Sequence, residues 1–151
     1  MLSAKDKPTA PSPETLACGS RDVKLDVSVD QSQHPTPLPP DGKALVYLLG
    51  DVMHERIGID GKWVGANHRG TYFFVPIDPG EHHLCVFASV AGHTFLALHA
   101  LQAKPGDTYY FVPAVMSYGG NWSGRYALEQ LDPDEGKYLV SRARFITSRP
   151  K

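Results

Sequence analysis

The sequence carries almost no excess charge and lacks long apolar runs, and each absence excludes a class of protein. Its 15 Lys and Arg residues nearly balance 16 Asp and Glu residues, which gives a formal net charge of −1. Binding to nucleic acid depends on Lys and Arg that neutralise phosphates, so we expect no nucleic-acid partner. No apolar stretch reaches the roughly 18 residues of a membrane-spanning helix, so we expect no membrane span.

The polar, proline-rich segment before Cys18 also lacks the apolar core of a signal peptide. Two interpretations follow from this absence. Either the chain is cytoplasmic, or its export signal is missing from this sequence.

Reactive motifs are missing as well. The chain contains no HExxH or CxxC metal motif and no GxSxG nucleophile elbow, so we predict no catalytic residue and no cofactor. The weak metal candidates are His83 and His99, which would lie opposite each other if residues 90–92 formed a three-residue hairpin loop. A two-residue turn would shift the register and separate them. A metal-dependent protein or enzyme centred on this pair is therefore an alternative to a protein without catalytic activity.

The chain contains two cysteines, Cys18 and Cys85. We predict a disulfide between them, which would place the protein in an oxidising compartment. Because Leu84 and Val86 share one face of their strand, they can take the core while Cys85 points outward to meet the N-terminal arm. The alternative is two unrelated thiols, with Cys85 as a small core residue.

Short apolar runs separated by turn signals occupy the middle of the chain. Asp60-Gly61 is a dipeptide that favours a type I′ hairpin turn, and Pro79-Gly80 and Pro105-Gly106 favour type II turns. The run from Ala44 to Leu49 is apolar without alternation, which is typical of a central strand covered on both faces. The regular spacing of these turn signals predicts an all-β fold. We expect an antiparallel β-sandwich of the immunoglobulin or transthyretin type with seven to nine strands.

The two ends of the chain differ from this pattern. Residues 1–19 lack apolar periodicity, so we expect a disordered N-terminal arm followed by a single domain over residues 20–151. Residues 31–42 contain four prolines and are expected to form an extended, polyproline-like loop. A last strand is expected from Tyr126 to Leu131. Asp132 is then predicted to cap a short C-terminal helix that ends near Arg144.

Aromatic residues suggest a ligand site between the last two predicted strands. Tyr118, Asn121, Trp122 and Tyr126 lie in or beside a glycine-rich loop, where flat rings and an amide would suit a sugar or a peptide. The alternative is that these rings cover the end of the core.

Several of these segments together resemble a known family. GKALVY, RIGIDGKWVG, TYFFV, PGEHHL and AKPGDTYYF occur in this order, and LDPDEGKYLVSRARF follows them. The stretch from Gly42 to Val115 resembles a bacterial family of domains of unknown function, DUF 2846, and its xDGxxVG hairpin and PGxHxL turn are similar to PEGA-type modules. The resemblance implies a small β-sandwich, often exported or lipid-anchored, without established enzymatic activity.

The function that this resemblance implies is a non-catalytic module of the bacterial cell envelope that binds or scaffolds. Its partner would be an envelope protein or a glycan, and its location periplasmic or exported, with a cytoplasmic location as the alternative. Binding of carbohydrate or peptide through the loop from Tyr118 to Tyr126 is the alternative function.

Overall fold

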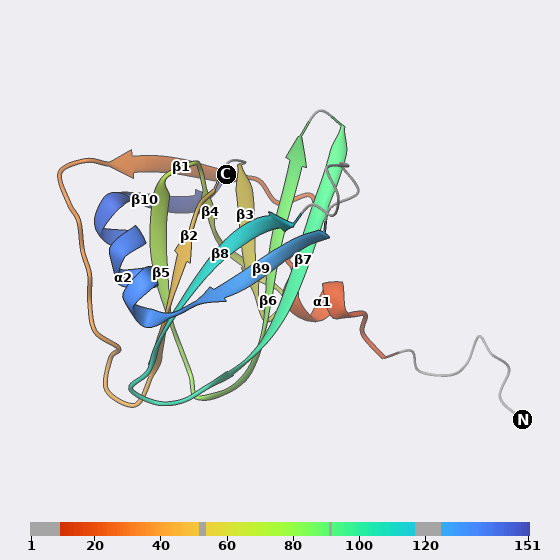
Figure 1. The fold of residues 1–151 in the computed structure, drawn as a ribbon. Helices are drawn as coiled ribbons and strands as arrows, with labels where there is room; N and C mark the ends of the chain where they lie inside the picture. The colour runs from red at the N-terminus through yellow and green to blue at the C-terminus, as the bar shows by residue number, and fades with distance from the viewer. Residues whose placement is uncertain (1–9, 52–53, 91, 117–124) are drawn as a thin grey trace, which may run out of the picture.

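The computed structural model describes residues 10–51, 54–90, 92–116 and 125–151. Two β-sheets face each other around an apolar core, and a short helix lies against the outer face of each sheet (Figure 1). The sheets form a sandwich and not a closed barrel. The predicted mostly-β, two-sheet class is therefore confirmed.

The larger sheet has six strands in the order β1-β10-β5-β2-β8-β9. Its strands are β1 (Leu25–Asp30), β2 (Ala44–Leu49), β5 (Thr71–Ile77), β8 (Thr108–Met116), β9 (Arg125–Leu131) and β10 (Arg144–Pro150). The smaller sheet has four antiparallel strands in the order β4-β3-β6-β7. Its strands are β3 (Glu55–Ile59), β4 (Lys62–Asn67), β6 (Gly80–Val90) and β7 (His93–Ala103).

Two features of the larger sheet correct the prediction of a purely antiparallel sandwich with seven to nine strands. Strand β2 pairs with β8 in parallel, and β10 pairs with β5 in parallel. The described residues also contain a tenth strand, β10, after the C-terminal helix, where we expected none. Turn signals identify hairpins between consecutive strands, whereas parallel pairing joins segments that are far apart in the chain, so turn chemistry could not reveal it.

Helix α1 (Pro13–Ala17) corrects part of the prediction for the N-terminal arm. Ser12 caps this helix, and its side chain accepts a hydrogen bond from the backbone N–H of Thr15 at 3.2 Å. We expected disorder throughout residues 1–19 because the segment has no apolar periodicity. Residues 13–17 are instead ordered by contact with the smaller sheet, which local composition does not report.

Helix α2 (Pro133–Arg142) begins as the sequence predicts. The Asp132 side chain accepts a hydrogen bond from the backbone N–H of Asp134 at 3.0 Å. The helix ends at Arg142, two residues before the predicted end near Arg144. Neither helix in the described part of the chain is long and apolar enough to cross a membrane.

Strand β2 is central and covered on both faces, as its uninterrupted apolar sequence predicts. Val46 and Leu48 point into the core between the sheets, whereas Leu45 and Tyr47 point to the other face, toward α2. The predicted Asp60-Gly61 turn is also present, with φ values of 53° and 86°. These positive values are those that a type I′ hairpin turn requires.

Candidate functional site

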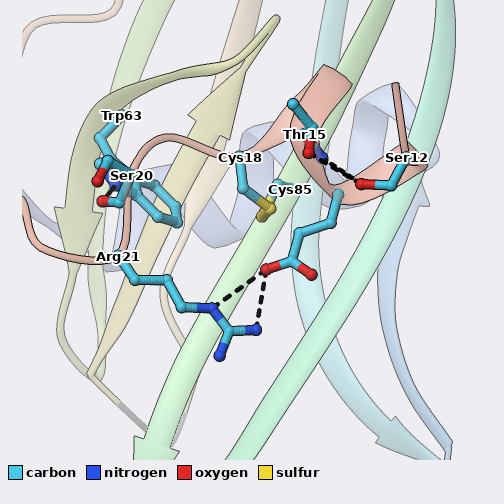
Figure 2. Close-up of a disulfide and its surroundings, with 8 residues drawn as sticks. Ser12, Thr15, Cys18, Ser20, Arg21, Trp63 and Cys85 are labelled. Carbon is cyan, nitrogen blue, oxygen red and sulfur yellow. Dashed lines mark hydrogen bonds and ion pairs between the residues drawn. A yellow bond between two sulfur atoms is a disulfide. The ribbon is translucent and has the colours of Figure 1, made fainter. Parts of the chain in front are cut away.

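A disulfide between Cys18 and Cys85 fastens the N-terminal segment to the outer face of the smaller sheet (Figure 2). The two Cα atoms lie 5.3 Å apart, within the range that a disulfide needs. Cys85 packs with Ala17 and Cys18, while Leu84 and Val86 point into the core. The predicted bridge and the predicted outward direction of Cys85 are therefore confirmed.

Hydrogen bonds hold the same segment, residues 12–23, which we call the N-terminal strap. The Gly61 N–H donates to the Ala17 carbonyl at 3.2 Å, and the Trp63 indole N–H donates to the Ser20 carbonyl at 2.6 Å. Both donors belong to the β3–β4 hairpin, as Figure 2 shows for Trp63. The strap is thus joined to the smaller sheet by covalent and hydrogen bonds.

Two arginines complete the attachment of the strap. The Arg56 guanidinium donates to the Val23 carbonyl of the strap at 2.6 Å and lies over the rings of Trp63 and Phe87, 4.6 and 4.8 Å from their centroids. Arg21 lies 5.3 Å from the Phe87 centroid and pairs with Glu14 at 2.9 Å. Burial, and then the positive charge of Arg21, lower the pKa of Arg56. These groups are engaged with the strap, so we assign this region a structural role.

A groove of about 730 Å³ lies on the outer face of the larger sheet, between residues 34–38 and helix α2. We call it the tyrosine groove, because Tyr47 and Tyr110 line its inner part. Their rings stack with centroids 5.0 Å apart and planes 16° apart. Leu38, 84% exposed, and Lys137 lie at its rim. Two largely buried rings thus form the base of the groove, and an apolar side chain and a cation face solvent at its rim.

Tyrosine hydroxyls bind the proline-rich segment that forms one wall of this groove. The Tyr47 hydroxyl donates to the Pro37 carbonyl, and the Tyr72 hydroxyl donates to the Pro35 carbonyl, each at 2.8 Å. Burial raises the pKa of both tyrosines to about 12, with a further contribution to Tyr47 from Tyr110 and Tyr72. Both hydroxyls therefore remain protonated donors at neutral pH. These buried rings and hydroxyl donors thus hold the chain's own extended, proline-containing segment against the larger sheet.

Sequence reasoning missed this groove. Its signal was present in two places: the prolines of residues 35–40, and the alternate positions Leu45, Tyr47 and Leu49 of the central strand. We interpreted the first as a connecting loop and the second as ordinary core. Only the fold shows that the proline-rich loop passes over these outward side chains.

Three of the four residues predicted as a ligand site, Tyr118, Asn121 and Trp122, lie outside the described residues. Tyr126 lies inside the sandwich, where its ring packs edge-on against Phe95 with centroids 5.7 Å apart. Burial, and then the negative charges of Glu55 and Asp51, raise the pKa of Tyr126. This ring belongs to the core, which matches the alternative that we gave for it.

The register of the β6–β7 hairpin separates the two weak metal candidates. Val90 pairs with His93, and in this register His99 lies opposite Leu84 rather than His83. His99 points inward, where its ring contacts Phe111, whereas His83 points to the opposite face. The expectation of a three-residue loop, which would bring these histidines together, is therefore wrong.

A different pair of histidines lies in contact at the edge of a second cleft, which has a volume of about 450 Å³. The ring centroids of His54 and His68 are 4.1 Å apart. Burial, and then the charges of His54 and Arg144, lower the pKa of His68. Within the described ranges, no three side chains of His, Cys, Asp or Glu converge as metal ligands. We therefore assign no metal centre to this cleft.

Comparison of the chain with protein-family models, with curated proteins and with solved structures finds no match. The resemblance to DUF 2846 therefore stays a prediction from the residues quoted above.

Proposed function

We propose that this protein is a non-catalytic binding module of the bacterial cell envelope, and that it binds an extended, proline-containing peptide in the tyrosine groove. The envelope location is supported by the Cys18–Cys85 disulfide, because disulfides persist in oxidising compartments outside the cytoplasm. The class of module rests on the sequence resemblance.

The observation that carries the choice of ligand is the way the chain binds its own prolines. Tyr47 and Tyr72 donate hydrogen bonds to the carbonyls of Pro37 and Pro35. Aromatic grooves recognise polyproline helices by this chemistry, since such a helix has no internal hydrogen bonds and leaves its carbonyls available. Because these two hydroxyls are engaged by the chain's own carbonyls, a second extended segment would lie beside residues 34–38 and contact the exposed lining of the groove.

The size and chemistry of the groove support this proposal. A volume of about 730 Å³ falls within the range of roughly 300–1,000 Å³ that is usual for ligand sites. Leu38 offers an exposed apolar contact at the rim, while Gln130 and Lys137 offer hydrogen-bond donors for peptide carbonyls. These are the groups that a short extended peptide needs.

Titration calorimetry with a proline-rich decapeptide tests the proposal, with a glycine-serine peptide of equal length as the ligand control. We expect binding of the first peptide, and a severalfold weaker affinity in Leu38→Ala. Leu98→Ala is the matched control, because Leu98 is an exposed leucine on the other sheet. Absence of binding to the wild-type protein at millimolar peptide would refute the proposal.

The same titration distinguishes the alternative site. Carbohydrate binding that is lost in Trp122→Ala but kept in Leu38→Ala would favour the loop from Tyr118 to Tyr126. Peptide binding with the reverse pattern would favour the tyrosine groove.

A further inference from the structure

The second cleft, of about 450 Å³, gathers basic side chains where residues 21–27 pass beside β3 and β4. Its lining includes four Lys and Arg residues and two histidines, which are Arg21, Lys24, His54, Arg56, His68 and Lys151. We call it the basic cleft. Because the whole chain has a net charge of −1, this concentration of basic groups is a product of the fold and not of the overall composition.

Two of the four Lys and Arg side chains are paired with acids outside the lining. Arg21 pairs with Glu14 at 2.9 Å, and Lys151 pairs with Asp26 at 3.6 Å. In the described part of the chain, Lys24 has no acidic side chain within ion-pair distance, and the same holds for Arg56. These two cations are therefore the ones that can pair with a ligand.

Among the described lining residues, the acid is Glu55, and its side chain belongs to the interior. Glu55 is 1% exposed and lies two residues before Ile57, which points into the core from the same face of β3. Its negative charge contributes to the raised pKa of Tyr126 inside the sandwich. The carboxylate therefore does not face the solvent-accessible part of the cleft.

Arg56 is held in place before any ligand arrives. Its Nη1 donates to the carbonyls of Val23 and Arg21 at 2.6 and 3.3 Å, and its plane is fixed over two aromatic rings. A guanidinium has five N–H donors, so those on Nε and Nη2 remain for a ligand. A donor that is already ordered loses little entropy on binding, which favours recognition of an anion.

The charges that act on two lining residues from within this region are positive. Arg21 adds to burial in lowering the pKa of Arg56. His54 and Arg144 add to burial in lowering the pKa of His68. Cations brought together in this way repel one another, and an anion between them relieves that repulsion.

The variety of donors indicates which anion would fit. The cleft offers a guanidinium, an ammonium and two imidazoles from separate segments of the chain, so its donors approach from different directions. A phosphate group has several strong acceptor oxygens arranged in a tetrahedron, whereas a carboxylate has two in one plane. The volume also falls within the range of roughly 300–1,000 Å³ that is usual for small-ligand sites.

We propose that the basic cleft binds a phosphate group, with Lys24 and Arg56 as its charged partners. The group belongs either to a small soluble phosphate ester or to the headgroup of an anionic lipid. The described lining of this cleft shares no residue with that of the tyrosine groove, so the inference is independent of the peptide ligand proposed above.

Two titrations of the full chain at constant ionic strength test the proposal and distinguish the two sources. The soluble probe is glycerol 3-phosphate, with sodium chloride as the reference. The lipid probe is vesicles of phosphatidylcholine with phosphatidylglycerol, with vesicles of phosphatidylcholine alone as the reference. Binding of glycerol 3-phosphate at millimolar concentration would identify a soluble ester, and binding to the phosphatidylglycerol vesicles alone would identify a lipid headgroup. Absence of binding to both probes would overturn the proposal.

A pair of lysine variants tests whether the basic cleft is the site. We expect Lys24→Gln to weaken binding severalfold, because it removes one of the two available cations. Lys62→Gln is the matched control, since Lys62 is an exposed lysine of β4 that lies outside the lining, and it should bind as the wild type does. Both lysines are exposed, so neither change should disturb folding. Binding that is unaffected by Lys24→Gln, or weakened equally by both changes, would overturn the proposal.

Discussion

Gly136 of helix α2 lies directly against the ring of Tyr110. A Cβ atom placed on this glycine would come within 2.2 Å of the tyrosine Cγ and 2.5 Å of its Cβ. Tyr110 in turn stacks on Tyr47 at the base of the tyrosine groove. The glycine therefore sets how closely α2 approaches the larger sheet, and with it the position of one wall of the groove.

We predict that Gly136→Ala destabilises the protein, although helix propensity alone favours alanine by about 1 kcal/mol. The added methyl group must displace the Tyr110 ring or lift the helix, and overpacking of this kind costs about 1–3 kcal/mol. Urea unfolding measures the difference in the free energy of unfolding. Lys137→Ala is the control, because Lys137 is exposed on the same helix and should have little effect. A more stable Gly136→Ala protein would contradict the close contact.

Gly58→Ala should destabilise the protein through the N-terminal strap. A Cβ at Gly58 would lie 2.7 Å from the Ala17 carbonyl oxygen and 3.0 Å from the Cys18 Cα, and both are backbone atoms that cannot rotate away. We expect a loss of about 1–3 kcal/mol in the free energy of unfolding.

The loss at Gly58 should be smaller in a variant that lacks both cysteines, since the strap can then move off the sheet. A double-mutant cycle measures this coupling. Equal losses in the two backgrounds would show that Gly58 acts independently of the strap.

Reduction of the disulfide should lower the free energy of unfolding by about 4 kcal/mol in the chain-entropy account, because the bond closes a long loop. The two cysteines are 67 residues apart in the sequence. Urea unfolding with and without a phosphine reductant measures the change, and the Cys18→Ser/Cys85→Ser variant serves as a control that the reductant should not affect. Two free thiols in denatured, unreduced protein from an oxidising compartment would show that the bond does not form.

The stabilising contribution of His82 should disappear as the pH rises. Burial disfavours the charged form of His82. Its hydrogen bonds to the Asp60 carboxylate and the Asp78 carbonyl favour that form, and so do the negative charges of Asp60 and Asp78. These interactions outweigh burial and raise the pKa of His82. The distances from Nδ1 to Asp60 and from Nε2 to the Asp78 carbonyl are 2.5 and 2.6 Å. A group with a raised pKa stabilises the folded state below its unfolded pKa of about 6.5, and this stabilisation is lost as the pH passes the folded value.

Asp60→Asn tests this prediction, since asparagine also tolerates the positive φ of residue 60 and keeps an acceptor for the His83 N–H. Its cost in the free energy of unfolding should be larger at about pH 5.5 than at about pH 9. Asp41→Asn, at an exposed position, should show no such trend. A cost for Asp60→Asn that does not change with pH would exclude the charged interaction.

Local chemistry in the sequence was sufficient for several features. Asp60-Gly61 predicted its turn, because few residues other than glycine and Asp or Asn accept positive φ. Asp132 predicted the start of α2, because the exposed N–H groups of a helix need an acceptor. The alternation of Leu84, Cys85 and Val86 predicted which face of the strand would meet the strap, since successive side chains of a strand point to opposite faces.

The sequence by itself thus determined the β class, the Asp60-Gly61 turn, the cap of α2 and the direction of Cys85, all of which depend on residues close together in the chain. The tertiary structure alone decided the β6–β7 register that separates His83 from His99, the parallel pairing of β2 with β8, and the passage of residues 34–38 over Tyr47 and Tyr72. The physical reason is the same in each case. These arrangements are selected by burial and hydrogen bonding between segments far apart in the chain, and no local pattern of residues records which distant segment will be the partner.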